Sequence, residues 1–349
     1  MKYYCGLDVS LNKTAICVVN QDGDIIREGE ALTEPEAIHK WLTTLALPIE
    51  RAGIEAGGLT PWLCHELLAM GWPAICIETR HAKAALQAQQ VKTDRNDARG
   101  LAHVMRTGWF KEVHVKSHAS QKLRLLLNNR RCLLDKKQDI ERQIRGTLKV
   151  FGLKTGAVTR ARYEARIREL IEGDRELESY VIPMLDARRP LIEQYKKLEK
   201  IILDRVKNDE TCRRFMTIPG VGPLTALSFK TFVDRPERFK KSKNVGAALG
   251  LTPRKYASGE IDYDGGITKC GDRFVRAHLF EAAKVLLSRA SPKPNDLRAW
   301  GLRIAKRSSK KIACVAVARQ LAVIMHAMWR DGTVFQFSAN ENGPQAIAA

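Results

Sequence analysis

Hydrophobic positions along the first hundred residues alternate between short strand-like runs and helical spacing. Asp22-Gly23 separates two apolar runs and is a hairpin signal. Strands are predicted at 3–9, 14–20, 25–30, 51–55 and 74–77, and helices at 34–45, 61–70, 80–89 and 95–107. A hairpin followed by strand–helix–strand alternation predicts a mixed α/β sheet.

From residue 117 onwards the pattern changes to long, charged helices. Apolar residues form one stripe on each of two predicted helices, at Leu126, Leu133, Ile140 and Ile144 and at Leu191, Tyr195, Leu198 and Ile202. Helix-breaking residues interrupt the region at Gly152, Gly156, Gly173, Pro183 and Pro190. We therefore expect an antiparallel helical pair rather than one rod, and leave open whether it also dimerises as a coiled coil.

A second compact, mostly helical unit is predicted to begin near residue 215. It contains a glycine-rich hairpin region at 256–266 and helices at 273–288, 295–306 and 310–329. The polar, small-residue segment after Val334 predicts disorder. We therefore expect an α/β domain at 1–115, a helical connector at 116–208, a mostly α-helical domain at 209–332 and a flexible tail at 333–349.

Composition and charge narrow the function. The 44% of apolar residues in a chain of 349 can form two packed units. The net charge is +20, and residues 113–349 carry all of the excess, with 47 Lys and Arg against 25 Asp and Glu. This excess indicates a polyanionic partner, with nucleic acid ahead of an anionic membrane. Eight cysteines without a C-x-x-C pair, and no run of 18 apolar residues, predict a cytoplasmic protein without a zinc site or a membrane span.

Four carboxylates of the first domain are candidate catalytic metal ligands. Asp8 follows a strand, Glu55 ends one, and Asp94 and Asp97 start a helix that Thr93 can cap. Four carboxylates converging on one point require hard divalent cations, Mg²⁺ or Mn²⁺, between them. Each residue has a plainer interpretation, as a turn residue, a surface charge or a helix N-terminal charge. Their joint occurrence on a hairpin-first α/β domain favours the layout of RNase H-like and RuvC-like nucleases.

The second compact unit carries two motifs. Residues 218–225 look like a helix-hairpin-helix turn, in which Gly220 and Gly222 let backbone N–H groups approach a phosphate, and a plain tight turn is the alternative. Ser258 lies on a glycine-flanked loop among cationic residues, namely Arg254, Lys255, Lys269, Arg273 and Arg276. A cationic pocket would neutralise the charge that develops when a serine attacks a phosphate, although a Ser-Gly pair by itself is ordinary turn chemistry. No histidine lies in this loop, so a histidine-assisted triad is not indicated.

Six blocks in this order resemble the DEDD transposases of the insertion-sequence one-hundred-ten family, over nearly the whole chain from Gly6 to about Trp329. The acidic blocks are Gly6-Leu7-Asp8, Ile54-Glu55-Ala56 and Lys92-Thr93-Asp94-Arg95-Asn96-Asp97-Ala98. The later blocks are Ile218-Pro219-Gly220-Val221-Gly222, Gly250-Leu251-Thr252-Pro253-Arg254 and Ser258-Gly259 with Thr268-Lys269-Cys270-Gly271. Thr268 departs from the serine that the family commonly has there, and it retains a hydroxyl.

The resemblance implies a RuvC-like domain, a helical connector and a transposase domain. It implies that Asp8, Glu55, Asp94 and Asp97 hold the metal and that Ser258 attacks DNA to form a covalent phosphoserine intermediate. It also implies a structured guide RNA from the element's non-coding end, which pairs with donor and target DNA, and dimers that assemble into tetramers. A protein that holds both RNA and DNA needs the cationic surface found here.

Other interpretations remain open. One is a metal-dependent, junction-resolving nuclease in which the carboxylates activate water and Ser258 is structural. Another is a non-catalytic nucleic-acid-binding protein with a degenerate nuclease fold. An actin-like sugar kinase also begins with a strand carrying Gly-x-Asp, but a second glycine-rich phosphate loop is missing and a charge of +20 is wrong for a metabolite enzyme.

Overall fold

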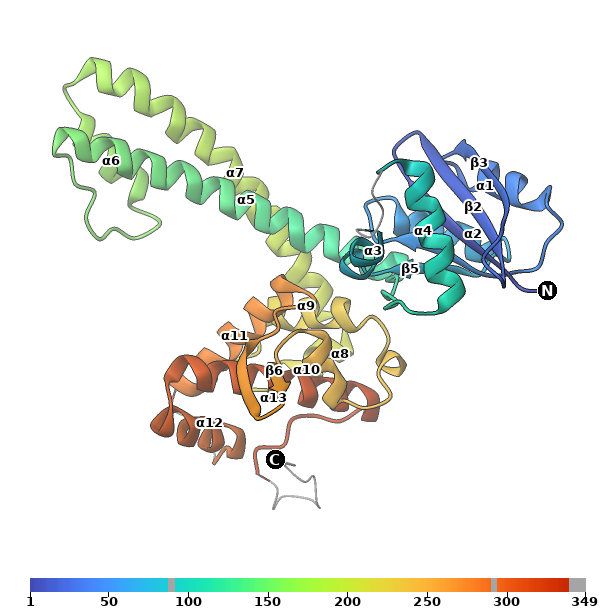
Figure 1. The fold of residues 1–349 in the computed structure, drawn as a ribbon. Helices are drawn as coiled ribbons and strands as arrows, with labels where there is room; N and C mark the ends of the chain where they lie inside the picture. Colours follow the sequence, from blue (N-terminus) through green and yellow to red (C-terminus); the bar gives the residue numbers. More distant parts are fainter. Residues whose placement is uncertain (87–91, 290–293, 339–349) are drawn as a thin grey trace. The chain divides into compact units, whose positions relative to one another are not determined.

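The chain forms two compact units, Met1–Lys116 and Ser117–Ala349. The computed structural model describes residues 1–86, 92–289 and 294–338 (Figure 1). The boundary between the two units, after Lys116, lies within two residues of the domain boundary expected after residue 115. The helical connector and the helical domain that follows it belong to one unit rather than two.

A five-stranded sheet forms the centre of the first unit. Its strands are β1 (Tyr3–Val9), β2 (Lys13–Asn20), β3 (Ile25–Leu32), β4 (Ile49–Glu55) and β5 (Ala74–Ile77), in the order β3-β2-β1-β4-β5. The first three strands are antiparallel neighbours, whereas β1, β4 and β5 run parallel. The turn before β3 forms because the Asn20 side-chain oxygen accepts three backbone N–H bonds and Gly23 takes φ +100°. The predicted mixed sheet is confirmed.

Helices cover both faces of this sheet. On one face lie α1 (Pro35–Thr43) and α2 (Thr60–Ala69), whose apolar side chains pack with those of Leu7 and Ile54. On the other face lies α4 (Asp94–Thr107), which packs against β1, β2 and β4. Among the described residues of this unit, the other helix is α3 (Thr79–Leu86), and the rest of the helix predicted at 80–89 lies outside the described residues. Because β1 is central, residues at its end stand beside elements from both halves of the domain.

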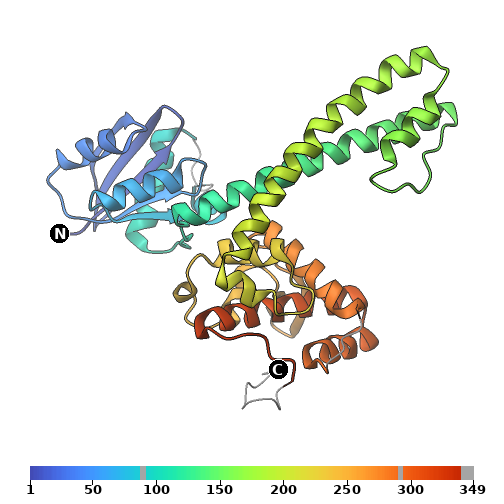
Figure 2. The same cartoon turned by 180° about the vertical axis from the view of Figure 1, so that it is seen from behind.

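The second unit begins with two long helices that run side by side in opposite directions (Figure 2). They are α5 (His118–Leu148) and α7 (Arg175–Lys207), and η1 (Lys149–Phe151) and α6 (Tyr163–Ile171) connect them. Apolar residues of α5, α6 and α7 form a core at the far end. Two cross-helix ion pairs also hold the helices together, Arg188 with Glu141 at 2.7 Å beside this core and Arg130 with Glu199 at 2.7 Å closer to the body. Both arginines are buried.

The expectation that prolines interrupt this helical pair is wrong. Pro183 and Pro190 lie inside α7, which continues through both for 33 residues. Both side chains are exposed, so the rings meet water rather than a packed neighbour. Gly152 and Gly173 do interrupt the pair, because each takes a positive φ, of +74° and +88°, between helices.

The body of the second unit is mostly helical. Its elements are α8 (Glu210–Phe215), α9 (Pro223–Val233), η2 (Pro236–Arg238), α10 (Lys243–Ala248), α11 (Arg273–Ser288), α12 (Asp296–Arg307) and α13 (Lys310–Asp331), with a hairpin of β6 (Pro253–Ser258) and β7 (Ile261–Ile267). Helix α13 contacts α8, α10, α11 and α12. In the described part of the chain it is the one helix long and apolar enough to cross a membrane, and half of its apolar stretch is buried in the core.

The last described residues differ from the predicted flexible tail. Phe335 is buried and Phe337 packs against the same core, with the two ring centroids 5.2 Å apart. The Phe337 carbonyl accepts a hydrogen bond from the Asp296 backbone N–H at 3.0 Å. Two aromatic side chains therefore fix a segment whose surrounding composition predicted disorder.

Candidate active site

Asp8 and Glu55 are neighbours on one face of the sheet. Strands β1 and β4 are parallel and pair Leu7 with Ile54, so the next residue on each strand stands about 5 Å from the other across the ladder. Leu7 and Ile54 face α1 and α2, and alternation turns Asp8 and Glu55 towards α4. Both carboxylates are half-buried.

Gly6 brings α4 into direct contact with β1. A Cβ atom at Gly6 would stand 2.1 Å from the Ala98 carbonyl oxygen and 2.4 Å from the Ala102 backbone nitrogen. No side chain fits there, so glycine is required for the helix to lie on the strand. Asp8 follows Gly6 by two residues on the same face, and the contact therefore fixes its distance from the start of α4.

Asp94 and Asp97 stand in the first turn of α4. Thr93 caps the helix as predicted, because its hydroxyl oxygen accepts the Asn96 backbone N–H at 3.2 Å. The pKa of Asp8 is raised to about 6, first by burial and then by the charges of Asp97, Asp94 and Glu55, in that order. Asp8 is therefore close enough to the other three predicted carboxylates for each of their charges to affect its pKa.

The donor set fits a hard divalent cation. All four side chains offer carboxylate oxygens, and a cation would relieve the repulsion that, after burial, contributes to the raised pKa of Asp8. Within residues 1–86, 92–289 and 294–338, however, no three His, Cys, Asp or Glu side chains lie close enough together to hold one ion. Binding of a shared ion would therefore require these side chains to move closer together, and the metal site stays a prediction.

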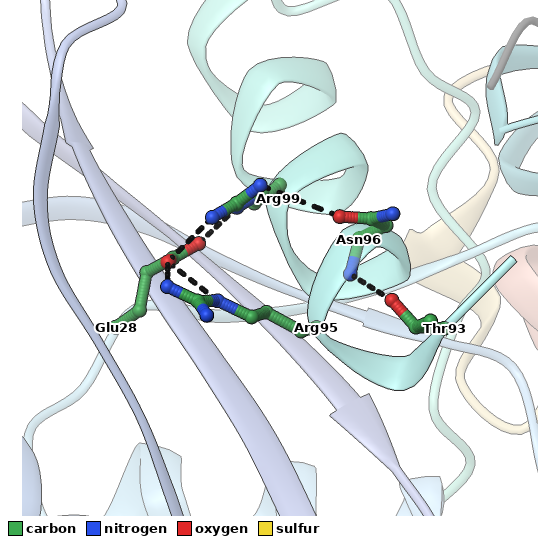
Figure 3. Close-up of polar contacts among 5 residues, drawn as sticks. All are labelled: Glu28, Thr93, Arg95, Asn96 and Arg99. Carbon is green, nitrogen blue, oxygen red and sulfur yellow. Dashed lines mark hydrogen bonds and ion pairs between the residues drawn. The ribbon is translucent and has the colours of Figure 1, made fainter. Parts of the chain in front are cut away.

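Glu28 is an anchor of α4 that sequence reasoning missed (Figure 3). Its carboxylate, on β3, accepts hydrogen bonds from Nε and Nη2 of both Arg95 and Arg99. These bonds lower the pKa of Glu28 to about 2. They also draw two cationic side chains of α4 towards β3. The signal available in the sequence was the i, i+4 spacing of the two arginines, which puts them on one side of a helix.

Thr60 fixes the turn after Glu55. Its hydroxyl donates to the Glu55 carbonyl oxygen at 2.5 Å and accepts the Gly57 backbone N–H at 2.9 Å. Thr60 is buried at the start of α2. The backbone that carries the Glu55 side chain is therefore held from the opposite layer.

Ser258 belongs to the second unit and stands at the tip of the β6–β7 hairpin. It pairs with Ile261 across a two-residue loop, in which Gly259 takes φ +56°. Every residue of β6 is exposed. Within the described part of the chain, the Ser258 hydroxyl has no hydrogen-bond partner. The serine is therefore accessible to a large substrate.

The five predicted cationic residues do not surround Ser258 evenly. Arg254 and Lys255 lie on β6 itself, and Lys255 pairs with Asp262 at 2.5 Å. Lys269 and Arg273 follow the base of the hairpin, and both are exposed. Arg276 has a structural role that the sequence did not reveal, because its Nη1 donates to the Leu249 carbonyl at 3.0 Å and to the Cys270 carbonyl at 2.7 Å.

The predicted helix-hairpin-helix turn lies between α8 and α9. Gly220 has φ +90°, and a Cβ atom there would stand 2.5 Å from the Ala282 carbonyl oxygen on α11. This packing explains Gly220 without any phosphate. Gly222 precedes Pro223 at the start of α9, and a Cβ atom there would meet nothing within 4 Å.

Comparison with known proteins identifies relatives of both units. Residues 5–152 match a family model for DEDD transposases, described as Transposase, and residues 212–298 match one described as Transposase IS116/IS110/IS902 family. The transposase for insertion sequence element IS1111A of Coxiella burnetii is 28% identical over 332 residues, which cover 93% of this chain and 88% of the relative. The transposase for insertion sequence element IS1328 of Yersinia enterocolitica is 28% identical over 255 residues, covering 70% and 75%. A probable family 20 transposase of Pseudomonas aeruginosa is 24% identical over 299 residues, covering 83% and 87%.

Proposed function

The chain is a DNA transposase of the IS110 family of DEDD transposases, and from that premise we propose that it cuts and rejoins DNA through a covalent phosphoserine intermediate. In this proposal the sheet order and the α4 packing belong to a RuvC-like, RNase H-like domain. Ser258 is the nucleophile, and Asp8, Glu55, Asp94 and Asp97 hold Mg²⁺ or Mn²⁺.

The chemistry requires an accessible hydroxyl and neutralised phosphate charge. The Ser258 oxygen forms a bond to phosphorus while one bridging P–O bond breaks, and the serine proton ends on the hydroxyl that leaves. Rejoining reverses these bonds with a hydroxyl of another strand. A bound divalent cation would neutralise charge on the scissile phosphate. Exposure of Ser258 on a hairpin tip supports attack on a duplex too large for a closed pocket.

One observation carries the proposal. Asp8 stands at the end of the central strand with a pKa raised to about 6, first by burial and then by the charges of three further carboxylates. Such repulsion costs stability and is found where negative groups are kept together for a cation.

Excision of a complete element from a plasmid tests this proposal. We expect Ser258→Ala to abolish excision and Ser288→Ala, an exposed serine at the end of α11, to leave it unchanged. With labelled element-end DNA, wild-type protein should form an adduct that survives denaturation, and Ser258→Ala should form none. Wild-type excision by Ser258→Ala would overturn the serine mechanism.

The hydrolytic alternative makes a different prediction for the same gel. If the carboxylates activate water, cleaved DNA accumulates without any adduct, and Ser258→Ala still cleaves. Asp94→Asn should abolish cleavage under both mechanisms while leaving DNA binding intact, which separates both from a non-catalytic binding protein.

Guide RNA and assembly are part of the same proposal. The 47 Lys and Arg against 25 Asp and Glu in residues 113–349 support binding of more nucleic acid than one DNA duplex at the active site. Protein purified from cells that carry the whole element should retain a defined transcript of its non-coding end. Recovery of only random RNA would contradict guidance. Light scattering should give a dimer, and a tetramer once DNA is added.

A further inference from the structure

We propose that Tyr256 and Tyr263 form a stacking platform for a DNA base next to the phosphate that Ser258 attacks. The inference rests on the proposed role of Ser258. The two rings stack on each other across the β6–β7 hairpin, with centroids 5.0 Å apart and planes 19° apart.

The platform and the serine share one face of the hairpin. Tyr256 pairs with Tyr263, and Ser258 pairs with Ile261, which on each strand is two residues closer to the hairpin tip. Because side chains alternate along a strand, these four side chains point the same way. The Lys255–Asp262 ion pair lies on the opposite face, as the same alternation requires.

This face remains open to solvent. Tyr256 is 43% exposed, Tyr263 is 56% exposed, and Ile261 at the tip is 58% exposed. An isolated two-stranded hairpin is only marginally stable in water, and one that leaves its aromatic side uncovered indicates a surface that a partner completes.

The base of the hairpin is fixed, so the platform is held in place. The Thr268 backbone N–H donates to the Thr252 carbonyl at 2.9 Å, and the Lys269 N–H donates to the Gly250 carbonyl at 3.1 Å. A Cβ atom at Gly250 would stand 2.2 Å from the Cys270 carbonyl oxygen. The two strands that carry the tyrosines therefore leave the body from a closely packed junction.

The distribution of charge on the hairpin favours DNA as the occupant. The acidic residues of β7, Asp262 and Asp264, lie on the face opposite the tyrosines. A phosphate backbone that approaches Ser258 from the tyrosine side therefore avoids both carboxylates on the strand. Aromatic side chains beside a backbone-binding surface stack on bases of any sequence. This property suits an enzyme whose DNA target is, in the proposed function, selected by a guide RNA.

Excision assays with ring-selective substitutions test the platform. Loss of one stacked base typically weakens binding by about 5-fold to 150-fold. We expect Tyr256→Leu and Tyr263→Leu to reduce excision at least about fivefold, and Tyr256→Phe and Tyr263→Phe to stay within twofold of wild type. The matched control is Tyr180→Leu, an exposed tyrosine on α7, which should leave excision unchanged. Leucine variants with wild-type excision would overturn the proposal.

Two further measurements keep the result interpretable if the leucine variants lose activity through local unfolding. Tryptic cleavage after Arg254 and Lys255 reports whether the hairpin is closed, and its rate should match wild type. In wild-type protein, 5-iododeoxyuridine placed beside the cleaved phosphate should photo-crosslink to Tyr256 or Tyr263. Crosslinks found only elsewhere would overturn the platform. Unimpaired excision by Ser258→Ala would instead refute the serine mechanism on which it rests.

Discussion

Removing the charge of Glu28 should loosen α4 and with it the first turn that carries Asp94 and Asp97. Glu28→Gln keeps the shape of the side chain and removes the acceptor charge for Arg95 and Arg99. The pKa of Glu28 is about 2, against 4.5 for an ordinary glutamate, so the folded protein stabilises the ionised form by about 3 kcal/mol at most.

The structure reduces that upper figure. The Glu28 side chain is only 10% exposed, but that of Arg95 is 68% exposed, and water screens its share of the attraction. We therefore expect a loss of about 2 kcal/mol at pH 7. Because the pKa of Glu28 is lowered by folding, this stabilisation is present above pH 4.5 and is lost as the pH falls towards 2.

Hydrogen exchange of the α4 backbone measures this loss where it occurs. A change of about 2 kcal/mol corresponds to exchange that is roughly 30-fold faster in the peptide spanning 94–107. Glu30→Gln is the matched control, because Glu30 lies on the same strand and pairs with Lys13 at the surface. Exchange in Glu28→Gln no faster than in Glu30→Gln would refute the anchoring role.

Three further outcomes follow from the same structure. Gly6→Ala should cost about 3 kcal/mol of unfolding free energy, since its Cβ would collide with the α4 backbone. The control Gly58→Ala, whose Cβ would meet nothing within 4 Å, should cost far less. Equal urea midpoints for the two variants would contradict the close packing of α4 on β1. Without divalent metal, stability should fall as pH rises from about 4 to about 6, because folding raises the pKa of Asp8 to about 6 and so favours its protonated form. Asp8→Asn should remove this slope, and an unchanged slope would assign it to another group. Phe335→Ala should cost about 3 kcal/mol if the segment is packed as described, and a flexible tail would show no change in urea unfolding.

Local signals in the sequence predicted most of the fold. The strand–turn–strand pattern around Asp22-Gly23 gave β2 and β3, since an asparagine and a glycine suffice to make that turn. Thr93 predicted the start of α4 for the same reason, because capping depends on residues three apart. The helix predicted at 273–288 is α11 to the residue.

Long-range contacts could not be predicted in this way. Glu28 meets Arg95 and Arg99 across 67 and 71 residues, and no periodicity reports such a pairing. Arg276 looked like a phosphate ligand, yet its Nη1 binds two backbone carbonyls that only the folded loop brings together. Phe335 and Phe337 were overlooked because composition was averaged over a segment in which two side chains decide the outcome.

The prolines of α7 give the long helical pair a preferred direction of bending. Pro183 and Pro190 are two turns apart on the solvent-exposed side of the helix. Because proline has no backbone N–H, the carbonyl of Ser179 lacks a donor from Pro183, and that of Asp186 lacks one from Pro190. The hydrogen-bond ladder is therefore broken on the outer side only, while buried arginine–glutamate pairs tie the inner side to α5. Helix α7 should therefore bend towards α5 more readily than away from it.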